Sequence, residues 1–162
     1  MLFRSYGVHL AQVRLERDSC AIAVERFFVG YDVGRAVNPM LVEGQIVGGF
    51  AQGLGGALAE EFSYDAAGQP LSVTFADYLM PAACETPRVT VLLREDAPSP
   101  LNPLGIKGAG EAGVTGVGAA IASAIDDALQ LPGAVTKLPV TPPMVLALIA
   151  RRGCGTRSAG VS

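Results

Sequence analysis

The sequence is poor in charge and has no cluster of basic residues. Only 17% of its 162 residues are charged, with 12 Lys and Arg against 15 Asp and Glu, and half are apolar. The basic residues are scattered and do not alternate with aromatic side chains, so we expect no nucleic-acid partner. The length suits one domain. With so few charges and 20 glycines, however, the chain offers less solvated surface than an independent domain usually has. This composition favours a part of something larger.

Cysteines and targeting segments are also scarce. Cys20, Cys84 and Cys154 are odd in number and far apart, so they predict neither a disulfide framework nor a metal site. The N-terminus lacks the basic and apolar regions of a signal peptide. The longest apolar tract, 39–59, contains Glu43 and two glutamines, which argues against a membrane span. We therefore expect reduced thiols in a cytoplasmic protein.

The periodicity of apolar residues predicts an α+β fold. Alternation in 8–15 and again in 21–31, with Asp18 and Ser19 between them, predicts an antiparallel hairpin. The lone histidine, His9, falls in its first strand, where a structural role is the commoner one, and we assign it none. Strands and hairpins are predicted to pack with two long helices, about 39–61 and 115–130, and with a short C-terminal helix ending near 152. The other expected β-segments are a hairpin at 62–75, a strand at 88–94 and a short strand at 135–139.

The first long helix has two different faces. Asn38 is a good cap and Pro39 suits the first helical position. At 100° per residue one side is apolar and predicts the core, with Val47, Phe50, Leu54 and Leu58. The other side carries Gln45, Gly48, Gly49, Gln52 and Gly56. Interior glycines cost roughly 0.8 to 1 kcal/mol each in a helix, so a close contact should compensate. Either another element packs there, or a ligand lies along the helix and meets the two amides.

A second feature is the glycine-rich stretch N-P-L-G-I-K-G-A-G-E-A-G-V-T-G at 102–116. Its glycines allow something bulky to lie close to the backbone, and Thr115 is a natural cap for the helix that follows. Two interpretations of Glu111 remain open. An anion near a helix N-terminus stabilises the helix by about 0.3 to 1 kcal/mol. Alternatively, the carboxylate is a general base, held at a fixed distance from a reacting proton.

The same stretch contains G-x-G-x-x-G, formed by Gly108, Gly110 and Gly113. A dinucleotide-binding turn with this pattern needs a buried strand leading into it, but prolines at 98, 100 and 103 precede it, and proline cannot donate to a central ladder. Glu111 would also direct a negative charge toward the pyrophosphate. We therefore do not favour a nicotinamide site.

Three stretches together resemble the molybdenum-binding large subunit of the xanthine dehydrogenase/aldehyde oxidase family of molybdenum hydroxylases. They are D-V-G-R-A-V-N-P-M-L-V-E-G-Q-I-V-G-G-F-A-Q-G at 32–53, D-Y-L-M-P at 77–81 and S-P-L-N-P-L-G-I-K-G-A-G-E-A-G at 99–113. Their order and spacing match, and their residues are most similar to the branch that includes carbon monoxide dehydrogenase large chains. The resemblance covers about residues 7–148. It implies that 1–150 is the C-terminal part of a molybdopterin-binding domain. The small, polar residues at the end of the chain predict that 151–162 is a disordered tail.

The resemblance implies roles for particular residues. Glu111 matches the glutamate that takes a proton from a hydroxyl ligand of molybdenum. Gln45 matches a glutamine that hydrogen-bonds the molybdopterin and an oxygen ligand of the metal, and Lys107, Gly108 and Gly110 would shape the loop. The cofactor would be molybdenum–molybdopterin, with the cytosine dinucleotide form as one option. Iron–sulfur [2Fe–2S] and FAD subunits, the rest of the molybdenum subunit and a small-molecule substrate would be the partners. No residue of this chain is expected to bind the metal directly.

The departures from the family matter equally. Large subunits are several times longer, and this chain resembles only their C-terminal end. The earlier cofactor contacts, the substrate-recognising residues and the copper-bound cysteine of carbon monoxide dehydrogenases are absent from it. We therefore expect the C-terminal portion of a molybdenum hydroxylase, an oxidoreductase, inactive by itself. The alternative is a non-enzymatic remnant whose glycine and glutamine face only docks a protein partner.

Overall fold

The computed structural model describes residues 5–155, in which a three-stranded sheet packs with three helices. The strands are β1 (Tyr6–Leu15), β2 (Ile22–Asp32) and β3 (Val89–Arg94). The helices are α1 (Pro39–Leu58), α2 (Val117–Leu129) and α3 (Pro142–Gly155). The sheet order is β1-β2-β3, with β2 antiparallel to β1 and parallel to β3. The predicted α+β class is confirmed, and so are the first hairpin and the strand at 88–94.

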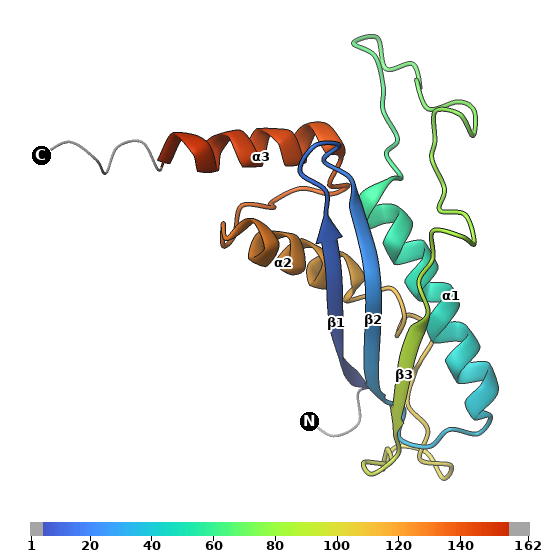
Figure 1. Cartoon of the computed structure of the whole chain (residues 1–162). Helices are drawn as coiled ribbons and strands as arrows, with labels where there is room; N and C mark the ends of the chain where they lie inside the picture. Colours follow the sequence, from blue (N-terminus) through green and yellow to red (C-terminus); the bar gives the residue numbers. More distant parts are fainter. Residues whose placement is uncertain (1–4, 156–162) are drawn as a thin grey trace, which may run out of the picture.

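The core lies between one face of the sheet and the helices α1 and α2, which Figure 1 shows behind the strands. Strand alternation directs Phe27 and Val29 into this core, where both are fully buried. The ring of Phe27 lies 4.4 Å from that of Phe50 in α1, measured between centroids. The opposite face of the sheet carries exposed apolar side chains, among them Leu10 and Leu92. The helices therefore cover only one side of the sheet.

Helix α1 begins where the sequence predicts. Asn38 is the cap, its side-chain oxygen accepts a hydrogen bond of 3.2 Å from the Leu41 amide, and Pro39 occupies the first turn. The helix ends at Leu58 rather than near 61. Its buried face includes Ile46, Phe50 and Leu54 but not Val47, which is 40% exposed. The predicted core face was therefore wrong at Val47, because the turn before α2 packs on α1 at Ile46, where Gly113 lies.

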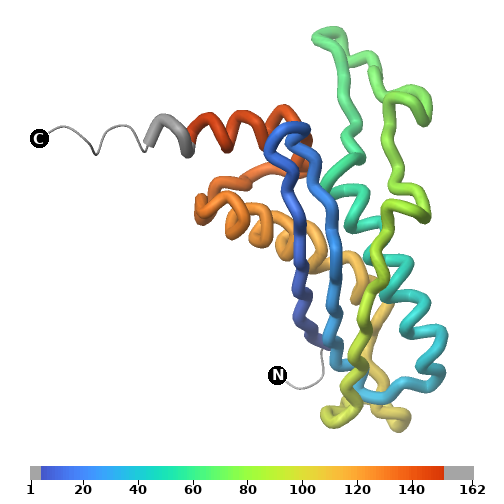
Figure 2. Tube along the Cα trace, in the orientation of Figure 1, coloured from blue at the N-terminus to red at the C-terminus, as the bar shows by residue number. Residues whose placement is uncertain are grey.

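Residues 59–88 form an arm with little regular structure, and its middle part extends beyond the end of α1 (Figure 2). The hairpin predicted at 62–75 is reduced to one isolated bridge, Tyr64 to Pro70, although Gly68 has the expected positive φ of 80°. Most side chains there are exposed, so the chain itself supplies no layer against which a ladder would pack. The hydroxyl of Tyr78 donates a 2.6 Å hydrogen bond to Glu60, which joins the later part of the arm to its start just beyond α1.

The C-terminal region differs from the prediction in two places. Residues 135–139 form no strand, and the chain instead turns so that the Val140 amide donates to the Ala57 carbonyl at 2.7 Å. Helix α3 continues to Gly155, past the expected end near 152. The remainder of the expected tail, 156–162, lies outside the described residues. Between residues 5 and 155, no helix is both long and apolar enough to cross a membrane.

Candidate functional site

Two of the predicted site residues meet across the fold. The side-chain amide of Gln45, in the N-terminal half of α1, donates a hydrogen bond of 3.0 Å to the backbone carbonyl of Gly110. Gly110 directly precedes Glu111, and both Gln45 and Glu111 are exposed. The structure therefore brings the helix and the glycine-rich loop together at a surface, although 65 positions separate the two bonded residues.

The carboxylate of Glu111 has no hydrogen bond or ion pair within residues 5–155, and its backbone is held firmly. The Glu111 carbonyl accepts the hydroxyl of Thr115 at 2.8 Å and the Thr115 amide at 3.2 Å. Thr115 is therefore not the cap of α2. That position is Gly116, which makes no side-chain bond. The prediction of Thr115 as cap was wrong, because its hydroxyl closes the preceding turn instead.

Lys107 anchors the start of this loop inside the protein. Its side chain is fully buried, and its ammonium forms an ion pair with the carboxylate of Asp32 at the end of β2. The other oxygen of Asp32 accepts the Gly34 amide at 2.9 Å, and the Lys107 amide donates to the Val33 carbonyl at 2.9 Å. The ammonium also lies 5.6 Å from the centre of the Tyr6 ring. Lys107 thus fixes the loop to the sheet, and its charge does not reach the surface.

The loop glycines serve different purposes. Only Gly105 has a positive φ, of 68°. Gly113 is buried against α1, where a Cβ atom would lie 2.0 Å from the Ile46 carbonyl oxygen, so this position needs glycine for close packing. Gly108 and Gly110 are exposed and have open space where a Cβ would be.

The glycines of α1 divide in the same way. Gly49 packs against Gly113, and Gly53 packs against Val117 of α2. Around Gly48 and Gly56, by contrast, no atom lies within 4 Å of a Cβ position. Gln45, Gly48, Gln52 and Gly56 are all exposed, and we call these four residues the amide face. Helix packing therefore explains Gly49 and Gly53 but leaves the amide face unexplained.

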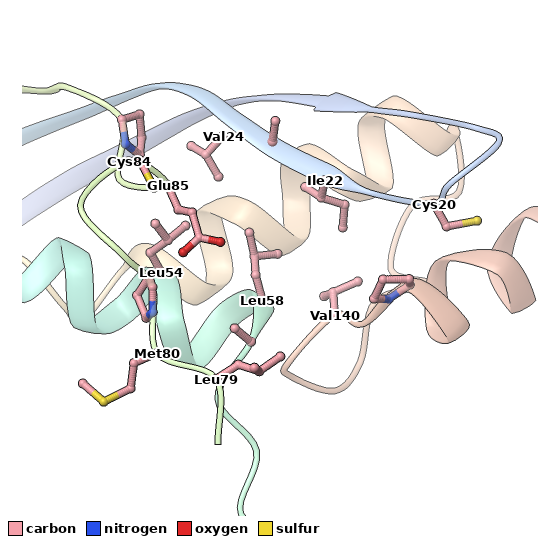
Figure 3. A pocket seen from close by; sticks show the side chains of 15 residues that line it. Cys20, Ile22, Val24, Leu54, Leu58, Leu79, Met80, Cys84, Glu85 and Val140 are labelled. Atoms are coloured by element: carbon pink, nitrogen blue, oxygen red, sulfur yellow. The ribbon is translucent and has the colours of Figure 1, made fainter. Parts of the chain in front are cut away.

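The main apolar cavity lies elsewhere, near the C-terminal end of α1. It has a volume of about 620 Å³, and none of its lining residues is a predicted site residue. Figure 3 shows Leu54, Leu58, Met80 and Val140 around it, with Cys20 and Cys84 at its margins. It offers few polar groups, so we do not place the chemistry there. Nor do the described residues contain a cluster of three His, Cys, Asp or Glu side chains suited to a metal ion.

A family model described as molybdopterin cofactor-binding domain matches residues 2–87, which is more than half of the chain. The chain belongs to this family. The 6-hydroxypseudooxynicotine dehydrogenase complex subunit gamma of Paenarthrobacter nicotinovorans is 49% identical over 140 residues, covering 86% of this chain and 18% of that protein. The carbon monoxide dehydrogenase large chain of Hydrogenophaga pseudoflava is 36% identical over 76% of this chain and 15% of its own length. These relatives confirm the resemblance to molybdenum hydroxylase large subunits.

Solved structures agree with the sequence comparison. Quinoline 2-oxidoreductase from Pseudomonas putida 86 superposes with a TM-score of 0.85 at 39% identity, over 90% of this chain and 19% of that one. The chain therefore spans less than a fifth of the relatives it matches. Glu111 lies beyond the segment matched by the family model. A 140-residue alignment within 162 residues nevertheless includes Glu111 wherever it begins.

Sequence reasoning missed two residues of this region. Asp32 heads the D-V-G-R motif and received no role, although it is the partner of Lys107. His9 was set aside as structural, yet its ring lies against the turn that follows Glu111, since a Cβ on Gly116 would come within 2.6 Å of it. A charged residue at the end of an apolar strand was the available signal for Asp32. For His9 no such signal existed, because the contact joins distant segments.

Proposed function

We propose that this chain is the C-terminal portion of a molybdenum hydroxylase large subunit, in which Glu111 is the catalytic base and Gln45 contacts the molybdopterin cofactor. The observation that carries the proposal is the hydrogen bond of Gln45 to Gly110, beside a carboxylate that has no partner among the described residues. The alternative role of Glu111 is that of an anion that stabilises the start of a helix. Its contacts do not support this role, because the carboxylate accepts no hydrogen bond from a backbone amide of α2.

The residues present fit a large planar cofactor. The amide face has no side chain at two of its four positions, and Gly108 and Gly110 extend the same bare surface into the loop. Glycines at these places let a ring system approach the backbone. The amides of Gln45 and Gln52 can both donate and accept hydrogen bonds, as the edge of a pterin requires. Lys107 contributes only through the backbone of the loop that it anchors.

A bound molybdenum cofactor would supply the two-electron chemistry of a hydroxylation. The chain supplies the proton acceptor and the geometry. Glu111 can take up one proton at its carboxylate, which is exposed and has no partner among the described residues. The turn closed by Thr115 and the bond from Gln45 fix the backbone on either side of that carboxylate, as a general base must be held at hydrogen-bond distance from its proton.

The test uses an assembled enzyme that contains this sequence within a complete large subunit, together with its electron-transfer subunits. Oxidation with an artificial electron acceptor is measured for the wild type and for Glu111→Gln, at equal molybdenum content. Removal of a general base should lower kcat by about 10²- to 10⁴-fold. Equal rates for the two proteins would end the assignment of Glu111. The names of three similar proteins, which include 6-hydroxypseudooxynicotine, nicotine and quinoline, make nitrogen heterocycles the first substrates to assay.

The competing function is a protein-docking module without a cofactor, for which the bare amide face is the only argument. Molybdenum content separates the two. A docking module should hold no more molybdenum than background, whereas the proposed enzyme should hold close to one metal per large subunit and lose it when the amide face is altered.

A further inference from the structure

The imidazole of His9 lies between the sheet and the turn that follows Glu111. His9 is in β1 and meets the edge of Phe27, with ring centroids 5.8 Å apart at an angle of 71°. On its other side, a Cβ atom at Gly116 would lie 2.6 Å from the ring. The imidazole therefore fills the space beneath the turn 111–116.

The ring also meets the backbone of this turn. The carbonyl of Ala112, the residue after Glu111, acts as a hydrogen-bond partner that raises the pKa of His9, but burial lowers it by more. Burial therefore favours the neutral imidazole. Its Nδ1 atom is buried and has no hydrogen-bond partner within residues 5–155.

An unpaired buried nitrogen has a cost in free energy that an apolar side chain of similar shape would avoid. Histidine can interact with the Ala112 carbonyl, whereas an apolar side chain of similar shape cannot. Ala112 and Gly113 are buried while Glu111 is exposed, so the place of the carboxylate depends on how these two neighbours are anchored. Gly113 rests on Ile46 of α1, and the turn rests on the His9 ring at Gly116, with the Ala112 carbonyl as a further partner of the imidazole.

We propose that His9 is a positioning residue that supports the turn 111–116 from below and so fixes the Glu111 carboxylate for proton transfer. This inference rests on the proposed function. A glutamine amide can imitate a ring N–H at this place, whereas leucine fills the space without any donor. Val13, on the same strand and facing the same core, is a matched control that touches the core and lies away from the Glu111 turn.

The experiment compares His9→Leu, His9→Gln and Val13→Ala in the assembled enzyme, with kcat expressed per bound molybdenum and KM and Tm measured alongside. We expect His9→Leu to lower kcat by about 10- to 100-fold with KM within about twofold, as displaced catalytic groups do. His9→Gln should recover most of that loss. Val13→Ala should lower Tm yet leave kcat within about twofold, which separates positioning from general stability.

Normal kcat in His9→Leu, combined with an inactive Glu111→Gln, would overturn the inference and leave the proposed function standing. An active Glu111→Gln would instead remove the proposed function itself. If His9→Leu fails to take up molybdenum, His9→Asn is tested instead, because its shorter amide stays polar but ends near the position of Nδ1, the ring nitrogen that has no partner within residues 5–155. A loss of kcat of about tenfold or more in His9→Asn supports the inference, and a normal kcat contradicts it.

Discussion

The amide of Gln45 donates a 3.0 Å hydrogen bond to the carbonyl of Gly110, so helix α1 holds the loop at the residue before Glu111. Any ligand that needs the Gln45 amide must therefore lie beside the backbone that leads into Glu111. This single contact makes the amide face and the glycine-rich loop one surface.

Replacement of Gln45 tests that surface. Gln45→Leu keeps much of the bulk of the side chain but removes the donor to Gly110 and any donor to a cofactor. We expect lower molybdenum content in the assembled enzyme and a lower kcat per bound metal, because both the ligand and the neighbouring base lose a fixed contact. The isolated chain should lose at most about 0.5 to 1.5 kcal/mol of unfolding free energy, as is typical of one exposed hydrogen bond. Unchanged metal content and kcat would show that Gln45 does not serve the cofactor.

The exposed glycines of α1 predict that one substitution stabilises the isolated chain but impairs cofactor binding in the assembled enzyme. In the isolated chain, Gly48→Ala should raise the unfolding free energy by about 0.8 to 1 kcal/mol, because the position is exposed in a helix and a Cβ there meets nothing. In the assembled enzyme the same methyl group should reduce molybdenum content. Gly53→Ala is the matched control, since its Cβ would lie 2.6 Å from Val117 and should destabilise the chain. Chemical denaturation and metal analysis measure both effects.

The buried pair of Lys107 and Asp32 predicts a strongly coupled double mutant. Lys107→Met leaves the Asp32 carboxylate buried without its cation, so the unfolding free energy should fall by about 3 to 5 kcal/mol. The double variant Asp32→Asn with Lys107→Met should lose clearly less unfolding free energy than Lys107→Met alone. Neither charge remains in it, and the asparagine oxygen can still accept the hydrogen bond from the Gly34 amide. Additive losses in urea denaturation would contradict this account of the pair.

Burial of His9 predicts how stability depends on pH. Because the pKa of His9 in the folded protein lies below its ordinary value of 6.5, the unfolded chain takes up this proton first as the pH falls. The contribution of His9 to the unfolding free energy is therefore constant above about pH 6.5, and the unfolding free energy decreases below that pH. His9→Leu should flatten this decrease between pH 7 and 5. Asp96 does not interfere, because a bond from Arg94 lowers its pKa from 3.8 to about 2, so its effect appears only at lower pH.

Much of the fold followed from local patterns. The hairpin of β1 and β2, the strand β3 and the cap at Asn38 were predictable, since alternation, turn residues and capping act over a few residues. The hairpin expected at 62–75 was not formed, although its glycine took the expected conformation. A turn can be specified by local residues, but a pair of hydrogen-bonded strands needs a surface to pack against. The segment at 62–75 finds little such surface within this chain.

By itself the sequence determined that Gln45 lies on a glycine-bearing helix face and that Glu111 lies in a bare loop, because both statements concern neighbours along the chain. Only the tertiary structure decided that these two segments meet, that Asp32 neutralises Lys107 and that His9 lies under the turn after Glu111. Each of these contacts joins residues far apart in the sequence. They depend on how the helices and the loop pack on the sheet, and no local pattern encodes that packing.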